Sequence, residues 1–219
     1  MEFRVVSRYN ERRKPDYTEG TRMDRNLLPK NFFRDNPLDD MSTARLADFS
    51  IRTVLKDDLN NELGKILQPV LSESRARDIR ESQAALDGLE TAEELVMYMR
   101  KGAESMTYPT LCRKALAIQD EIMPLIIRRY LTTAQTCFIE AAVRIFGNAD
   151  RKYTEELLKE YGNIRNLYAR ANACLLFGEF GMKETVPLLL SEYAKFRRNY
   201  PDESYAQCPL FALHMIYGE

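Results

Sequence analysis

The chain carries few histidine and cysteine side chains, the residues that most often serve as catalytic base, thiol nucleophile or zinc ligand. It has a single histidine, His214, and four widely spaced cysteines, Cys112, Cys137, Cys174 and Cys208. One histidine cannot build a zinc site alone, and no Cys-x-x-Cys pair supplies the missing ligands. We therefore predict no metal site and no cofactor, and we expect the cysteines to be buried, reduced thiols.

A cysteine–histidine nucleophile pair is the one catalytic arrangement that these residues could form. Cys174 and His214 fall on neighbouring predicted helices, so contact between them is conceivable. His214, however, sits among Leu213, Met215 and Ile216, which is typical of a residue on a helix face or at a helix end. The sequence also shows no glycine-rich phosphate loop and no strand-turn-helix nucleophile elbow. We expect no catalytic residues.

Composition indicates an ordinary soluble protein. The 219 residues are 45% apolar and 30% charged, and no apolar run approaches the roughly 20 residues needed to span a bilayer. The first eight residues have no apolar core of a secretory signal, so we expect a cytoplasmic protein without membrane association. Residues 1–34 carry a basic excess, 35–100 an acidic excess, and 101–219 are nearly balanced. A protein that binds the phosphate backbone usually has a larger basic excess.

Residues 1–40 are predicted to be an irregular N-terminal arm, because prolines and Gly20 interrupt any longer element. The arm mixes a basic stretch, Arg8 to Lys14, with aromatic residues such as Phe32 and Phe33. Three interpretations stay open: an arm packed along the helices, a partner-binding tail, or a nucleic-acid-binding arm. Phe32 and Phe33 favour packing, since a free tail gains little from such residues.

The rest of the chain is predicted to be helical. Apolar residues at helical spacing, with caps, glycines and prolines at the ends, predict these helices: 41–70, 73–87, 91–102, 109–118, 120–131, 133–147, 150–161, 164–178, 183–198 and 203–217. Thr91–Glu94 is a capping box, Thr132–Gln135 is a second candidate, and Asn163 is expected to cap the helix that follows it. The acidic stretch 57–62 lacks the glycine and spacing of a calcium loop, so we expect a solvated helix face. Pro209 should kink the last helix or delay its start.

One turn, within residues 173–190, organises this helical part. Gly178 closes an apolar helix, and Gly181 can adopt the left-handed conformation that ends a helix. Pro187 lies in the first turn of the next helix, where fewer amide hydrogens need an internal partner. Gly147 and Gly218 also follow an aromatic residue at the end of an apolar run, which indicates a two-helix repeat. Pro124, between Met123 and Leu125, resembles Pro187 in its setting.

This turn resembles a HEAT repeat of the short type also found in phycobilisome lyases. The matching residues are Phe177-Gly178-Glu179-Phe180-Gly181 and Glu184-Thr185-Val186-Pro187-Leu188-Leu189, with Arg170 at the basic position of that family. The resemblance implies an all-α protein, an α-α superhelix (HEAT-like repeat solenoid) with an irregular N-terminal arm. We expect three regions: the arm, 1–40; N-terminal helices packing on the array, 41–106; and HEAT-like helical repeats, 107–219.

Two enzyme-linked classes share this type of repeat. The HEAT-like alkylpurine DNA glycosylases use tryptophans to hold DNA and a catalytic aspartate beside a basic concave face. The chain has no tryptophan and a balanced repeat region, which argues against that activity. Nothing in the sequence marks a bilin site either, so the repeat pattern alone does not imply lyase activity.

The resemblance favours a non-catalytic interaction module or scaffold that binds a partner protein. In HEAT-type solenoids the second helix of each pair lines the concave side. The second helices would be 133–147, 164–178 and 203–217, and Tyr, Arg, Asn and His are the residue types that often anchor interfaces. The predicted partner-binding residues are Arg144, Arg165, Tyr168, Asn172, Tyr205, Gln207 and His214.

Two other functions stay open. The chain could bind nucleic acid or repair DNA bases like the HEAT-like glycosylases, which the basic stretch of the arm would support. It could also dock its arm on a second copy of itself. The sequence does not indicate the oligomeric state.

Overall fold

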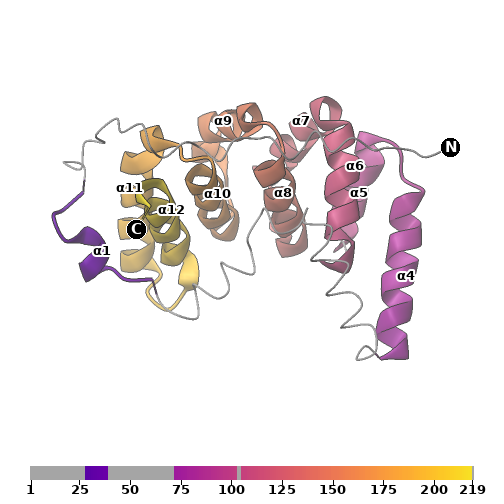
Figure 1. The fold of residues 1–219 in the computed structure, drawn as a ribbon, viewed down its shortest axis with the longest axis horizontal. Helices are drawn as coiled ribbons and strands as arrows, with labels where there is room; N and C mark the ends of the chain where they lie inside the picture. The colour runs from indigo at the N-terminus through magenta and orange to yellow at the C-terminus, as the bar shows by residue number, and fades with distance from the viewer. Residues whose placement is uncertain (1–27, 39–71, 103–104, 219) are drawn as a thin grey trace. The chain divides into compact units, whose positions relative to one another are not determined.

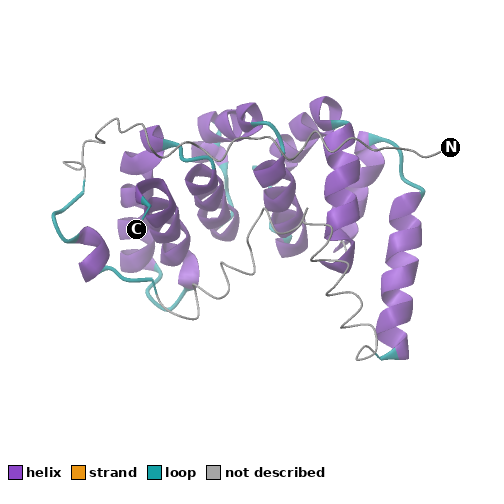
Figure 2. Cartoon of the chain, viewed as in Figure 1, coloured by secondary structure: helices purple, strands orange, loops and turns teal. Residues whose placement is uncertain are grey.

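The computed structural model of the protein describes residues 28–38, 72–102 and 105–218. These residues are helical, and Figure 2 shows no strand among them, so the predicted all-α class is confirmed for this part of the chain. Its α-helices are α1 (Phe32–Asp35), α4 (Glu73–Asp87), α5 (Ala92–Gly102), α6 (Tyr108–Ala117), α7 (Gln119–Tyr130), α8 (Thr136–Asn148), α9 (Arg151–Lys159), α10 (Leu167–Glu179), α11 (Val186–Asn199) and α12 (Gln207–Tyr217). Four short 3-10 helices lie between them: η3 (Ser105–Thr107), η4 (Tyr161–Asn163), η5 (Lys183–Thr185) and η6 (Ser204–Ala206).

The chain divides into two compact units, residues 1–32 and 33–219. The structure describes only residues 28–32 of the first unit, so the fold below is that of the second. The predicted helix 41–70, with its acidic stretch, lies outside the described residues, as does the basic stretch Arg8 to Lys14. Within the described ranges, no helix combines the length and the apolar character needed to cross a membrane.

Helix α5 begins with the capping box that the sequence predicts. Thr91 Oγ1 accepts a hydrogen bond from the Glu94 amide at 3.3 Å, and the Glu94 carboxylate accepts from the Thr91 amide at 3.0 Å. The amides of Thr91 and Glu90 hold the pKa of the Glu94 carboxyl below its usual value. Helix α4 also spans the predicted residues, with Ser72 as its N-cap.

The predicted capping box Thr132–Gln135 is wrong. Thr133 Oγ1 accepts from the Gln135 amide at 3.2 Å, within the loop, and α8 begins only at Thr136. Thr132, the side chain that would cap a helix in that box, instead donates its hydroxyl to the Arg129 carbonyl at 3.4 Å, which competes with capping for the same side chain.

The predicted cap Asn163 is also wrong. Asn163 ends η4, and Asn166 caps α10 instead, with its Oδ1 accepting from the Ala169 amide at 3.0 Å. Both asparagines suit an N-cap, and the intervening 3-10 turn moves the helix start by one turn.

The helices from α5 onward stack in pairs. The second helix of each pair packs against the next second helix, since α6 contacts α8, α8 contacts α10, and α10 contacts α12. Each second helix also contacts the first helix of its own pair: α5 with α6, α7 with α8, α9 with α10, and α11 with α12. Figure 1 shows these helices following one another along the unit.

Three loops join the first to the second helix of each pair: 131–135, 160–166 and 200–206. The Arg165 amide donates to the Leu131 carbonyl at 3.0 Å, which ties the second loop to the first. In the third loop, η6 packs against α10 and α11. The first two loops thus adjoin each other, and the third packs on the helices α10 and α11; we call residues 131–135, 160–166 and 200–206 the loop edge.

At the other end, the first helices are joined by charged side chains. Lys152 Nζ donates to Asp120 Oδ1 at 2.8 Å, connecting α9 to α7, and the Tyr153 hydroxyl donates to the same carboxylate oxygen. Arg151 donates to Glu184 Oε1 at 3.1 Å, connecting α9 to η5. The four charged side chains are about half exposed or more, so each of these ion pairs contributes little to stability, whereas Tyr153 is buried.

Helix α10 lies at the centre of the packing. Its residues from Ala171 to Gly178 are all buried, and a helix that is buried on all sides requires an apolar surface all round. Gly178 lies within this helix, against Ala212 of α12. The expectation that Gly178 closes the helix is wrong by one residue, since α10 ends at Glu179.

The three glycines of the predicted repeat are not equivalent. Gly147 and Gly178 are each the last but one residue of their helix, whereas Gly218 follows α12 with φ +71°. Gly181 has φ +57°, as the sequence analysis expected, and the chain turns there between α10 and η5.

The prolines also differ in their positions. Pro187 is the second residue of α11, and Pro209 is the third residue of α12, whose start is delayed to Gln207 as one of the two expected outcomes. Pro124 instead is the sixth residue of α7 and lies inside that helix. The difference arises because residues 183–185 before α11 form a separate 3-10 turn, whereas residues 119–122 are already part of α7.

A buried ion pair joins α10 to α11. Arg170 donates to the Glu192 carboxylate at 2.8 Å, and its guanidinium lies over the Tyr161 ring, 4.7 Å from the centroid. The side chains of Arg170 and Glu192 are only 16% and 6% exposed. The basic position of the family resemblance is thus occupied by a residue that binds helices together.

Candidate protein-interaction surface

The structure does not bring the seven predicted partner-binding residues into one cluster. Arg144 lies on α8, and Tyr168 and Asn172 lie on α10. Arg165 and Tyr205 lie on the loop edge, and Gln207 and His214 on α12.

Two of these residues join neighbouring second helices. The Arg144 guanidinium lies over the Tyr108 ring of α6, 4.6 Å from its centroid. The Tyr168 hydroxyl donates to Glu140 Oε1 of α8 at 3.2 Å. Burial, and then the Glu140 carboxylate, raise the pKa of Tyr168, so the hydroxyl stays protonated and donates. Arg144 and Tyr168 therefore take part in the stacking of the helices.

Asn172 lies inside the protein. It is only 3% exposed, and its Nδ2 donates to the Tyr168 carbonyl, one turn earlier in α10, at 2.8 Å. In this conformation Asn172 presents no surface to a partner. The prediction from helical spacing that Asn172 lies on the surface is wrong, because this part of α10 is buried on all sides.

Arg165 and Tyr168 mark the exposed beginning of α10. Arg165 is exposed, with its backbone held by the Leu131 carbonyl, and Tyr168 is half-buried. The exposed cations Arg128 and Lys159 end the neighbouring helices α7 and α9. Arg165 of the loop edge is thus followed by an aromatic side chain at the start of α10, and Arg128 and Lys159 lie in the helix turns that precede the first two loops.

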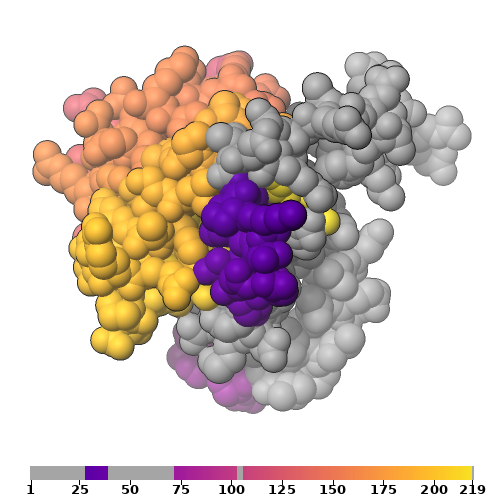
Figure 3. All heavy atoms as spheres, turned by 90° about the vertical axis from the view of Figure 1, so that its left-hand side faces the viewer, coloured from indigo at the N-terminus to yellow at the C-terminus, as the bar shows by residue number. Residues whose placement is uncertain are grey.

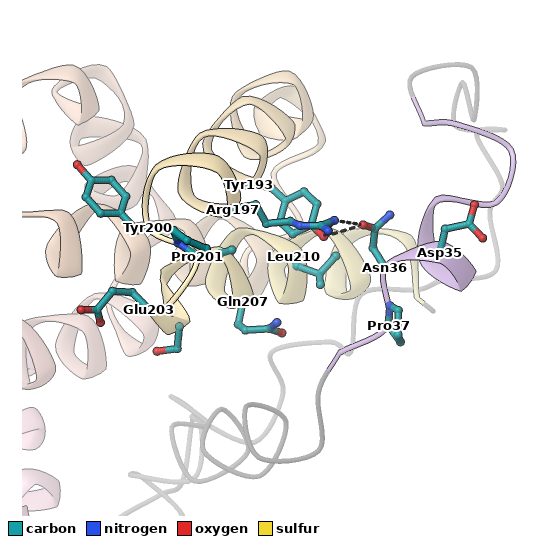
Figure 4. A pocket seen from close by; sticks show the side chains of 12 residues that line it. Asp35, Asn36, Pro37, Tyr193, Arg197, Tyr200, Pro201, Glu203, Gln207 and Leu210 are labelled. Atoms are coloured by element: carbon teal, nitrogen blue, oxygen red, sulfur yellow. Dashed lines mark hydrogen bonds between the residues drawn. The ribbon is translucent and has the colours of Figure 1, made fainter.

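At the beginning of α12, an aromatic cluster supports the third loop. The Tyr205 ring lies 5.8 Å from the Phe196 ring and 6.0 Å from the Tyr200 ring, centroid to centroid. Tyr200 and Gln207 line an open pocket of about 520 Å³. Figure 4 shows this pocket between α11, the third loop and residues 35–37. It is lined by Asp35, Asn36, Pro37, Tyr193, Arg197, Tyr200, Pro201, Glu203, Ser204, Ala206, Gln207 and Leu210.

The structure argues against Cys174 as a nucleophile. The thiol is buried, lies 3.4 Å from the Tyr161 hydroxyl, and donates to the Arg170 carbonyl. Burial raises its pKa well above the usual value, so almost no thiolate is present at neutral pH. His214 contacts the Phe33 ring instead, with centroids 4.5 Å apart.

The other cysteines are also free thiols. Burial raises the pKa of Cys112 and of Cys208 to about 12. Within the described ranges, no three His, Cys, Asp or Glu side chains are grouped so as to hold a metal ion.

Sequence reasoning missed the contacts that Asn36 makes with α11. Asn36 Oδ1 accepts from the Tyr193 hydroxyl at 2.7 Å and from Arg197 Nη1 at 2.8 Å. A partial signal was present, since Tyr193 and Arg197 are four residues apart and so share a helix face. Nothing in the sequence indicates that this face meets Asn36, which is 157 residues away.

Comparison with known proteins gives no relative for this chain. No family model matches it, and searches of curated proteins and of solved structures also found no match. The HEAT-like resemblance therefore stays a prediction.

Proposed function

We propose that the chain is a non-catalytic protein-interaction module of HEAT-like architecture, a scaffold in which pairs of helices form an α-α superhelix. The observation that carries this proposal is the packing of second helix on second helix, from α6 through α8 and α10 to α12. In a solenoid each repeat contacts only its neighbours, and the repeated units present one extended surface. Such a surface binds partners without needing a catalytic constellation.

The partner surface in this proposal is the loop edge with the first turns of α10 and α12. Four of the predicted residues lie there: Arg165, Tyr168, Tyr205 and Gln207. Arginine and tyrosine often anchor protein interfaces, because each combines a large contact area with directional hydrogen bonds. This location replaces the middle of α10, where Asn172 is buried.

Nucleic-acid binding is the second candidate, and exposed cations in the loop edge and in the helix turns that precede it support this candidate. Arg128, Lys159 and Arg165 are exposed, and none of them has an ion-pair partner among the residues that the structure describes. Exposed cations of this kind would contact phosphates.

The proposal includes a cytoplasmic location. The four cysteines are free thiols, which fits a reducing compartment, where disulfides are rare.

The test is affinity capture from the source lysate with the tagged full chain, with and without nuclease. Three forms are compared: the unchanged chain, Arg165→Glu on the loop edge, and Lys183→Glu as the matched control. Lys183 is exposed in η5, near the charged contacts at the opposite ends of the first helices, so both variants make the same charge change at different ends.

We expect the tagged chain to capture one partner protein in stoichiometric amount, and this protein should stay bound after nuclease treatment. Arg165→Glu should weaken its capture at least about tenfold, as loss of an interface anchor does, while Lys183→Glu retains it. Loss of all captured partners on nuclease treatment would favour the second candidate. Equal capture by all three forms would contradict the proposed surface.

A further inference from the structure

The surface formed by α11 and α12 already holds a short peptide, which is a segment of the chain itself. Figure 3 shows the segment that includes residues 33–38 beside the surface of the C-terminal helices. Within this segment, Phe33 contacts α12 and Asn36 contacts α11.

The first anchor is aromatic. The Phe33 ring lies 4.5 Å from the His214 ring and 5.7 Å from the Tyr217 ring, with tilted planes in both cases. His214 and Tyr217 are three residues apart on α12, so they lie on one face and receive the ring together. Tilted aromatic pairs at these separations are a favourable arrangement.

The second anchor is polar and accepts hydrogen bonds from two side chains of α11. Asn36 Oδ1 accepts from the Tyr193 hydroxyl at 2.7 Å and from Arg197 Nη1 at 2.8 Å. Arg197 also donates to the Tyr193 hydroxyl at 3.1 Å, which closes a triangle of hydrogen bonds. Figure 4 shows both side chains of α11 directed at the asparagine oxygen. Both hydrogen bonds are accepted by a side-chain oxygen of residue 36. An asparagine or an aspartate can provide this oxygen, and an apolar side chain cannot.

The surface continues past the segment. The 520 Å³ pocket begins at Asn36 and Pro37 and extends along Tyr200, Glu203 and Gln207. A peptide that follows the same path therefore has room to extend beyond the position of Pro37.

We propose that α11 and α12 form a recognition site for a short peptide that carries an aromatic residue and, three residues later, an asparagine or aspartate. The chain's own residues 33–37 occupy this site in cis and so compete with any such peptide added in trans. This inference does not depend on the proposed loop-edge function, because it concerns purified chain and a defined peptide.

A tethered segment competes through its effective concentration. Because residues 33–37 belong to the same chain as α11 and α12, their effective concentration at the site does not change with protein concentration, so a cis segment of modest affinity competes with added peptide. The apparent affinity for added peptide is the intrinsic affinity multiplied by the fraction of molecules whose site is vacant. Disabling the cis segment should therefore raise the affinity for added peptide.

The experiment measures fluorescence anisotropy of a labelled synthetic peptide that spans residues 28–38, titrated with the full chain. Four forms are compared: the unchanged chain; Phe33→Ala/Asn36→Leu, which disables the cis segment; Asn36→Leu alone; and Phe33→Ala/Asn36→Leu combined with Tyr193→Phe/Arg197→Ala, which disables the site. Circular dichroism and thermal melting confirm that each form is folded.

We expect Phe33→Ala/Asn36→Leu to bind the peptide at least about tenfold more tightly than the unchanged chain, with Asn36→Leu alone in between. The combined variant should lose this binding by at least about tenfold, since both donors to the asparagine are gone. A peptide with Asn36→Asp should bind at least as tightly as the original, because a carboxylate accepts both bonds and pairs with Arg197. The inference is overturned if the cis-disabled variant binds no peptide, if it binds no more tightly than the unchanged chain, or if the combined variant binds equally well.

Discussion

Gly178 of α10 and Ala212 of α12 approach so closely that neither helix has room for another atom between them. A Cβ built on Gly178 would lie 2.6 Å from Ala212 Cα and 2.8 Å from Ala212 Cβ. The contact involves backbone, which cannot rotate away as a long side chain can. The spacing of α10 and α12 therefore depends on the absence of a side chain at residue 178.

Gly178→Ala should destabilise the protein by about 1–3 kcal/mol. Overpacking of this kind exceeds the roughly 1 kcal/mol that alanine gains over glycine inside a helix. Equilibrium denaturation in urea measures the change. Gly162→Ala is the control, because no atom lies within 4 Å of the added Cβ, and it should change stability by less than about 0.5 kcal/mol. An unchanged or raised stability of Gly178→Ala would contradict the close approach.

Gly181→Val should destabilise the protein by about 1–3 kcal/mol for a different reason. Gly181 has open space around it but a φ of +57°, which a β-branched residue resists. Gly181→Asn should cost less, since asparagine tolerates the left-handed conformation. Both variants add a side chain at residue 181, so a difference between their melting temperatures reports backbone strain and not the added volume. Equal melting temperatures for the valine and asparagine variants would show that strain at residue 181 is not the cause.

Arg170→Met should destabilise the protein by about 3–5 kcal/mol, because it leaves the buried Glu192 carboxylate without its main partner. Replacing both residues, Arg170→Met/Glu192→Met, should cost much less than the two single changes added together. A double-mutant cycle by denaturant unfolding measures this. Lys195→Met is the control, since Lys195 reaches Glu192 only at 3.7 Å and is 40% exposed, and it should cost less than about 1 kcal/mol. If Arg170→Met lowers the free energy of unfolding by less than about 1 kcal/mol, the buried Glu192 carboxylate does not need Arg170 as its partner.

Asp120 should titrate below its ordinary pKa of 3.8, mainly because of the hydrogen bond from Lys152 and then that from Tyr153. A folded pKa below the unfolded one means that these contacts stabilise the fold above the unfolded pKa, and that the contribution is lost as pH falls through the folded pKa. NMR titration of the carboxyl carbon gives the pKa directly. Lys152→Gln should raise the pKa toward 3.8, whereas Arg151→Gln, in the same turn of α9, should shift it much less. An Asp120 pKa that is insensitive to Lys152→Gln would contradict the contact between α7 and α9.

The all-α class and many helix starts follow from the sequence because they depend on local chemistry. The Thr91–Glu94 box, the exposed turn at Gly181 and the delayed helix at Pro209 involve residues only a few positions apart. The predicted cap at Asn163 failed because two nearby asparagines compete and a 3-10 turn decides between them. Local pattern cannot settle that choice.

The candidate site was less predictable because it depends on which surfaces stay exposed. Asn172 has the spacing of a surface residue, but α10 is enclosed by its neighbours. The contact between Asn36 and Tyr193 joins distant parts of the chain, and no local pattern encodes it. Arg165 was predictable as exposed because arginine is seldom fully buried, although its predicted place inside the helix 164–178 was wrong, since α10 begins at Leu167.

Amide hydrogen exchange of the chain, free and in complex with the partner captured by affinity purification, tests the proposed interaction surface most directly. We expect slower exchange in the complex at the loop edge and the first turns of α10 and α12, residues 131–135, 160–168 and 200–208. Residues 149–153 and 182–186, near the charged contacts at the opposite ends of the first helices, should exchange at unchanged rates. Slowing confined to 149–153 and 182–186, or no slowing at the loop edge, would contradict the proposal that this edge binds the partner.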